Sequence, residues 1–212
     1  MTLDELRAAL APIVATEAVF DGWTPTALAA AAAELGVPGD RARLCFPVAV
    51  DMIDAWYAAT DTAMADAFPP DRIAGLKMRM RIRELVAFRI AHMEPVREAA
   101  RGALAVLAMP QNLLTGTRLG WRAADSMWRL AGDTATDLNF YTKRATLSGV
   151  YLSTLLVWLG DDSPGRTDTS SFLDRRIDDV MKIEATKARY RDNAIYRPSL
   201  TRFLGRLRYP AA

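Results

Sequence analysis

The sequence predicts an all-α protein. Apolar residues recur at intervals of three and four over long stretches of the 212-residue chain, the spacing that places them on one face of a helix. The 12 glycines and 11 prolines stand at intervals and divide these stretches into about nine or ten helices. With 51% hydrophobic and 25% charged residues, the chain has the composition of a globular protein that can bury a core.

Three helices with a tight turn before the third are predicted at the N-terminal end. The first spans 3–20, and the pair Thr24-Pro25 gives an N-cap and a first-turn proline to a second helix over 26–35. The turn over 36–39 (sequence GVPG) leads into a short third helix near 40–44. Because helices joined by a short glycine-containing turn are typical of a helix-turn-helix, residues 1–68 are predicted to form a helix-turn-helix head.

The charge of this head argues against binding to nucleic acid. Residues 1–70 contain three basic and ten acidic residues, a net charge of −7. In the third helix only Arg41 and Arg43 could contact a DNA duplex. Phosphate binding requires several cationic contacts. We therefore expect a head with a structural role and no nucleic-acid partner.

A main helical domain is predicted over residues 69–190, after a fourth helix near 48–67. Cations alternate with apolar residues over 77–83, which could suggest a strand. A helix is favoured because an apolar stripe recurs at intervals of three and four: Met78, Ile82, Leu85 and Val86. Pro95 and Pro110 separate further helices over 96–107 and 111–130. The last predicted helix of this domain is amphipathic and spans 172–190.

The stretch 145–160 carries no charge between Lys143-Arg144 and Asp161-Asp162. An uncharged surface all round a helix indicates burial on all sides. The stretch is shorter than the roughly 20 residues that span a bilayer, and hydroxyl residues and glycine dilute it. It is predicted to be a central core helix rather than a membrane span.

The residues just before this stretch form a different kind of face. Asp137, Phe140, Tyr141 and Arg144 follow the spacing i, i+3, i+4, i+7 and share one side of the helix. Aromatic residues and Arg are enriched in binding hot spots, which favours a partner-docking patch. Ion-paired solvent cover explains the same spacing equally well.

Large apolar side chains are numerous in the main domain. Their spacing alone favours an ordinary hydrophobic core. The alternative is that they form the wall of a tunnel for a long apolar tail, since ligand pockets are mostly apolar with few polar groups. The residues predicted to bind lipid on this alternative are Trp121, Met127, Trp128, Tyr151, Leu155, Trp158 and Phe172.

The C-terminal segment, residues 191–212, is predicted to be a basic amphipathic tail that binds a membrane surface. Residues 189–209 contain six Arg and one Asp, a net charge of +5. A short helix with leucine and phenylalanine on one side and Arg beside them is typical of an interfacial anchor. The residues concerned are Leu200, Arg202, Phe203, Leu204, Arg206, Leu207 and Arg208. The alternative is a last helix that folds back onto the bundle.

The sequence contains no recognisable catalytic motif. His92 is the single histidine, so a histidine-containing zinc or di-iron site of the usual kinds is not expected, and no glycine-rich phosphate loop or dinucleotide fingerprint is present. Cys45 lies in an apolar run and is predicted to be buried. Helix capping explains Asp133 and Asp137 better than a catalytic pair does. We expect no catalysis, no metal and no cofactor.

The segments MWRLAGDTATDLNFYTKR (127–144) and VYLSTLLVWLGDDS (150–163) resemble the signature of the ninth Coq protein family of ubiquinone biosynthesis. Weaker similarity extends from about Leu3 to the C-terminus. Phe140 departs from the family, which more often has Trp there. An aromatic surface is kept, but the indole N–H is absent.

The resemblance implies a lipid-binding accessory protein whose fold is like that of TetR-type transcription regulators. It implies an isoprenoid quinone intermediate or a phospholipid as ligand, a ring-modifying hydroxylase of the ubiquinone pathway as partner, a membrane surface and a homodimer. We expect a bacterial cytoplasmic protein associated with the inner membrane, since Arg greatly outnumbers Lys and the N-terminal residues resemble neither an export signal nor a transit peptide. The alternatives are a TetR-type DNA-binding regulator and an enzyme that turns over without a partner.

Overall fold

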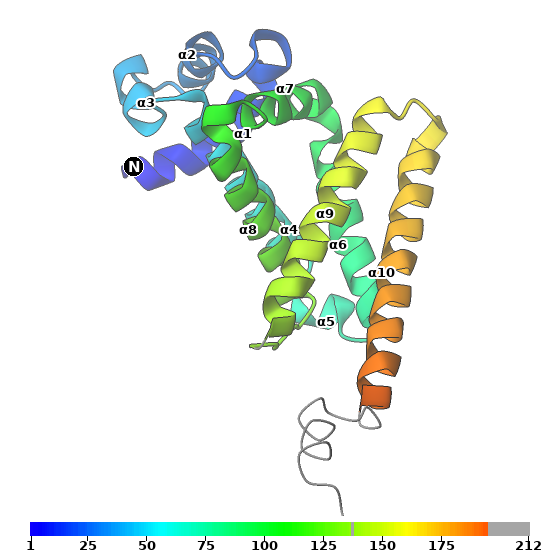
Figure 1. Ribbon diagram of the computed structural model, residues 1–212. Helices are drawn as coiled ribbons and strands as arrows, with labels where there is room; N and C mark the ends of the chain where they lie inside the picture. The colour runs from blue at the N-terminus through cyan, green and yellow to red at the C-terminus, as the bar shows by residue number, and fades with distance from the viewer. Residues whose placement is uncertain (137, 195–212) are drawn as a thin grey trace, which may run out of the picture. The chain divides into compact units, whose positions relative to one another are not determined.

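The computed structural model describes residues 1–136 and 138–194, and it does not describe the side chains of Leu138 and residues 183–194 (Figure 1). Asp137 and all seven predicted membrane-binding residues of the tail lie outside the described part. Within it the chain is helical and has no strand, so the all-α prediction is confirmed. The chain divides into two compact units, Met1–Asp174 and Arg175–Ala212.

The head forms as its cap and turn residues predict. Helices α1 (Leu3–Asp21), α2 (Pro25–Glu34) and α3 (Gly39–Cys45) follow one another closely. The Thr24 hydroxyl accepts a hydrogen bond from the Ala27 amide at the start of α2, and Gly36 takes a φ of 70° in the turn before α3. Helix α1 packs against α2, α3 and α4, which ties the head into the first unit.

The helices that follow complete the first unit, and the last of them continues past Asp174 into the second unit. They are α4 (Ala49–Ala67), α5 (Pro70–Ile73), α6 (Met78–Met93), η1 (Glu94–Val96), α7 (Arg97–Leu107), η2 (Pro110–Asn112), α8 (Leu113–Leu130), α9 (Leu138–Gly160), η3 (Pro164–Arg166) and α10 (Thr167–Ala194). Helix α8 packs along α9 and also meets α4, α6 and α7. Helix α10 begins at Thr167 rather than at the predicted Phe172, because side chains before it cap its first amides.

The prediction that the uncharged helix is buried on all sides is wrong. Along α9 a stripe faces outward at the spacing i, i+4, i+7, i+11: Ala145, Gly149, Leu152 and Leu156. Leu156 keeps 59% of its surface exposed, whereas Trp158 on the opposite side is fully buried. The helix therefore has two apolar faces, one buried and one exposed, which is why it carries no charge. An uncovered apolar stripe of this kind is typical of an interaction surface.

No helix among the described residues reaches the length and hydropathy that crossing a bilayer requires.

Candidate functional site

An apolar cavity of about 610 Å³ lies between α4, α7, α8 and α9. Its wall is built from one residue of α4, the C-terminal turn of α7, the first half of α8, and α9, which contributes buried residues and also Ala145 and Leu152 of its exposed stripe. The lining residues are Tyr57, Leu104, Leu107, Ala108, Leu113, Gly116, Thr117, Leu119, Gly120, Trp121, Ala145, Ser148, Tyr151, Leu152 and Leu155. A pocket of this size with so few polar groups suits the hydrocarbon part of a ligand.

The cavity wall contains no acidic or basic side chain, and its polar groups include Ser148 and Tyr57. The Ser148 hydroxyl lies 2.8 Å from the Arg144 carbonyl oxygen and 3.2 Å from that of Gly120, so its hydrogen-bonding capacity is used within the helices. Burial raises the pKa of Tyr57 well above its ordinary value, and its phenol is therefore neutral. The wall thus presents no charge to a ligand.

A buried cation lies behind the two tyrosines. Arg89 is fully buried, pairs with Asp61, and places its guanidinium 5.2 Å from the Tyr151 ring centroid and 6.0 Å from that of Tyr57. Arg122 of α8 also pairs with Asp61, at 3.2 Å. These contacts join α4, α6, α8 and α9 beside the cavity.

Three of the seven predicted lipid-binding residues line the cavity: Trp121, Tyr151 and Leu155. Met127 and Trp158 are fully buried elsewhere, and the Trp158 indole donates a hydrogen bond to Glu94. Trp128 and Phe172 are half-buried and do not line it. Tyr57 and the leucines of α7 and α8 also line the cavity but were not predicted, because helical spacing identifies an inward face without showing whether that face meets a neighbouring helix or a cavity.

The predicted docking patch lies at the start of α9. Tyr141 is 60% exposed, Phe140 is half-buried, and their rings meet edge to face at 5.1 Å. Arg144 differs from expectation because its side chain is only 2% exposed. Its guanidinium lies 3.5 Å from the Phe140 ring centroid, directly beneath the aromatic surface. Arg144 therefore supports the patch from within.

Two carboxylates hold Arg144 in place. Its Nε donates to Asp125 at 2.6 Å and its Nη1 to Asp133 at 3.2 Å. Asp133 also accepts a 2.6 Å hydrogen bond from Lys143. Burial would raise the pKa of Asp133, but the hydrogen bonds from Lys143 and Arg144 outweigh it and lower that pKa below its ordinary value. Asp133 also accepts a backbone hydrogen bond from Ala135, and the ion pairs with Lys143 and Arg144 add to it.

The patch and the cavity are adjacent. Trp121 lines the cavity, and its ring centroid lies 6.2 Å from that of Tyr141 on the surface. The cavity wall and the surface patch therefore meet at this pair of aromatic rings.

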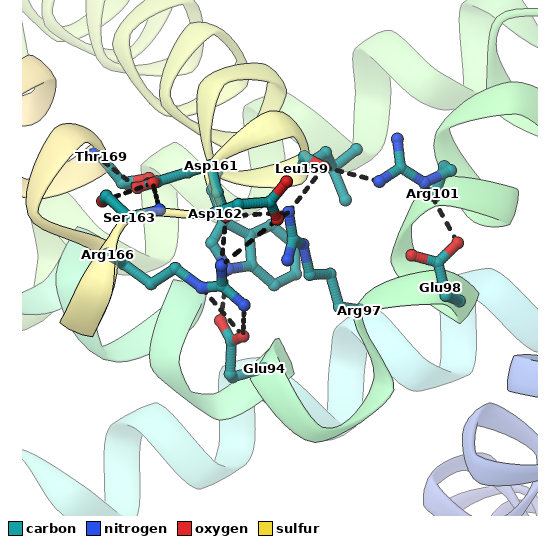
Figure 2. A network of polar contacts seen from close by, with 11 residues as sticks. Glu94, Arg97, Glu98, Arg101, Leu159, Asp161, Asp162, Ser163, Arg166 and Thr169 are labelled. Atoms are coloured by element: carbon teal, nitrogen blue, oxygen red, sulfur yellow. Dashed lines mark hydrogen bonds and ion pairs between the residues drawn. The ribbon is translucent and has the colours of Figure 1, made fainter.

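A second polar network fixes the C-terminal end of α9 (Figure 2). Arg97 and Arg101 donate to the Leu159 carbonyl oxygen at 2.8 and 2.6 Å, and Arg166 donates to Asp161 and to Glu94. Cations at the C-terminal carbonyls of a helix offset its dipole. The network anchors the end of the helix that forms one wall of the cavity.

Asp161 is the most heavily bonded carboxylate of this network. It is 4% exposed and accepts hydrogen bonds from the amides and hydroxyls of Ser163 and Thr169 at 2.5 to 2.8 Å. Burial would raise its pKa, but these four hydrogen bonds lower it far below the ordinary value. Its bonds to the start of α10 explain why that helix begins earlier than predicted.

No group of three or more His, Cys, Asp or Glu side chains that could hold a metal ion occurs in the described ranges 1–136 and 138–194.

Comparison with known proteins shows a COQ9 domain in this chain. The sequence profile of the COQ9 family matches residues 113–184, which include α8, α9 and the docking patch. The ubiquinone biosynthesis protein COQ9 of Rattus norvegicus is 33% identical over 172 residues, and that of Homo sapiens is 31% identical over the same length. Each alignment covers 78% of this chain, and the chain spans about half of each relative, 55% and 54%.

The fold is also that of a solved transcription regulator. The crystal structure of a TetR regulator from Nitrosomonas europaea superimposes with a TM-score of 0.65, covering 82% of this chain and 96% of the regulator. The two sequences are 23% identical, so the likeness concerns the fold alone. The predicted TetR-like fold is confirmed.

The expected bacterial location is wrong. It is contradicted by the relatives from rat, human, cattle and Dictyostelium discoideum, which are named mitochondrial proteins. The expectation came from the ratio of Arg to Lys and the acidity of the first residues, neither of which constrains the compartment of a folded domain. Similarity over most of the chain is the stronger observation: the chain carries a COQ9 domain and is a homologue of the COQ9 proteins of ubiquinone biosynthesis.

Proposed function

We propose that this protein is a non-catalytic carrier that binds an isoprenoid quinone intermediate in the cavity and presents it to a ring-modifying hydroxylase. The homologues support a role in ubiquinone biosynthesis. The observation that carries the proposal is the contact between Trp121 in the cavity wall and Tyr141 on the patch. Through this contact the bound molecule and the partner protein would lie on either side of the same two packed rings.

The physical need for such a carrier follows from the substrate. An isoprenoid tail gains about 0.8 kcal/mol for every CH₂ group that leaves water, so a quinone intermediate stays in the bilayer unless a protein offers an equally apolar site. The uncharged wall of the cavity offers that site. The docking patch on the surface of the same protein then brings the quinone ring to the hydroxylase.

The other parts of the chain have roles in the same proposal. Residues 1–68 serve as a structural head, residues 69–190 bind the lipid, and residues 191–212 bind the membrane surface. A second copy of the chain would cover the exposed stripe of α9, since that stripe is apolar and continuous. A DNA-binding regulator is the less favoured alternative, because the head carries a net charge of −7.

The test of presentation is the variant Tyr141→Ala. We expect its affinity for the ubiquinone-pathway hydroxylase to fall about 30-fold, the effect of losing an aromatic hot spot of about 2 kcal/mol. Its lipid content should stay unchanged because Tyr141 does not line the cavity. Biolayer interferometry measures the affinity, and native mass spectrometry measures the bound lipid.

Phe20→Ala is the matched control for this experiment. Phe20 is an aromatic residue in the head with 89% of its surface exposed, and its removal should leave hydroxylase binding intact. Unchanged hydroxylase binding by Tyr141→Ala would refute the docking role of the patch. Loss of lipid in that variant would assign Tyr141 to the cavity instead.

A further inference from the structure

The corner between α7 and α8 exposes large apolar side chains at the mouth of the cavity. Met109 is 44% exposed, Leu113 53% and Leu114 87%. Leu113 also lines the cavity, so the apolar surface runs without interruption from the corner into the interior. Exposed apolar surface of this kind indicates a binding surface.

Hydrogen bonds and close helix packing hold the corner in a defined conformation. The Asn112 side chain donates to the Val106 carbonyl oxygen at 2.8 Å, and the Asn112 amide donates to that of Met109 at 2.8 Å. Behind it, α8 approaches α7 so closely that a Cβ at Gly116 would lie 3.3 Å from the Leu107 carbonyl oxygen. The fold therefore holds these apolar side chains outward in a defined turn.

The charge distribution around the corner indicates what it meets. Residues 102–117 contain no charged side chain, and Arg101 and Arg118 flank them. Both arginines are at least half exposed; Glu98 pairs with Arg101 at 3.1 Å, and Asp54 lies 3.9 Å from Arg118. An uncharged tip can enter hydrocarbon without desolvating an ion, while arginines beside it stay at the headgroups.

We infer that the α7–α8 corner inserts Met109, Leu113 and Leu114 into the surface of a lipid bilayer. This contact is separate from the one proposed for the C-terminal tail. It rests on the proposed function, because it places the mouth of the cavity against the bilayer that holds the ligand. The isoprenoid tail would then pass from hydrocarbon to cavity along Leu113 without crossing water.

A fluorescent probe at the corner tests this inference in the 212-residue chain. Cys45 is 2% exposed, so the variant Leu114→Cys can be labelled selectively with an environment-sensitive dye. On vesicles of phosphatidylcholine and phosphatidylglycerol, its emission should shift to the blue and be quenched by nitroxide-labelled lipid. Phe20→Cys, labelled in the same way at a position with equal exposure, should show neither change.

An unlabelled variant measures the contribution of the corner to binding. Leu114→Ser should lower partition onto these vesicles about tenfold, which corresponds to about 1.4 kcal/mol of lost apolar burial. Leu44→Ser, which removes an exposed leucine of the head, should have no effect. Flotation of the protein with the vesicles measures both variants.

The outcomes separate this inference from the proposed function. A dye at position 114 that stays in water while the protein binds vesicles refutes the inference. A blue shift that appears without vesicles and grows with protein concentration also refutes it, because a second copy of the chain would then cover the corner. Neither result affects lipid binding in the cavity. A probe that enters the bilayer in a protein whose cavity never holds lipid supports the inference and refutes the proposed function.

Discussion

Replacing Arg144 with methionine should lower the free energy of unfolding by about 3 kcal/mol, because it removes the cation from a buried ion-pair network. The change leaves Asp133, whose side chain is 3% exposed, with Lys143 as its remaining cation. Asp125 keeps Arg129 at 2.7 Å. Urea denaturation followed by circular dichroism measures the difference.

Arg129→Met provides the matched control. Arg129 pairs with the same Asp125 but keeps 72% of its side chain exposed, so its loss should cost less than about 1 kcal/mol. Equal stability of the two variants would contradict the structural role assigned to Arg144. An Arg144→Met protein that keeps its stability and loses hydroxylase binding would make Arg144 a contact residue.

Replacing Gly120 with leucine should weaken the binding of an isoprenoid quinone at least tenfold, or by about 1.4 kcal/mol. Gly120 lines the cavity, and a Cβ at this position would meet no atom within 4 Å, so the new side chain can occupy the space that the ligand needs. Folding should be preserved, since leucine favours a helix over glycine by up to about 1 kcal/mol. Quenching of tryptophan fluorescence during titration with a detergent-solubilised prenylated quinone measures the affinity.

Gly149→Leu is the control for this cavity variant. Gly149 is a helical glycine of α9 with equally open space at its Cβ, but it lies on the exposed stripe and does not line the cavity. Its leucine should leave quinone affinity unchanged. Full affinity in Gly120→Leu would mean that the ligand binds elsewhere.

Local features of the fold were predictable from the sequence because short-range chemistry determines them. Thr24-Pro25 and the glycine at position 36 specify where α2 begins and where the turn to α3 lies, and both formed as expected. The stretches predicted over 48–67, 96–107 and 111–130 became α4, α7 and α8, with ends close to the predicted ones. The start of α10 was missed because its caps come from side chains that precede it in a folded loop.

Features that depend on long-range packing were not predictable in this way. The spacing of Phe140, Tyr141 and Arg144 correctly indicates one helix face, but whether Arg144 is exposed depends on Asp125 in another helix. The absence of charge in α9 suited both a buried helix and one with an uncovered apolar stripe. The cavity wall takes Tyr57, Leu104 and Leu113 from three helices, and no one-dimensional pattern records that these residues face a common void.

The identity of the molecule in the cavity decides whether this protein is a lipid carrier. Native mass spectrometry of the gently purified 212-residue chain, followed by extraction and identification of what dissociates, would reveal it. We predict an isoprenoid quinone or one of its prenylated precursors, bound to the wild-type protein and to Gly149→Leu and depleted from Gly120→Leu. A wild-type protein that stays empty after incubation with such a lipid would contradict the account and make the cavity a packing defect.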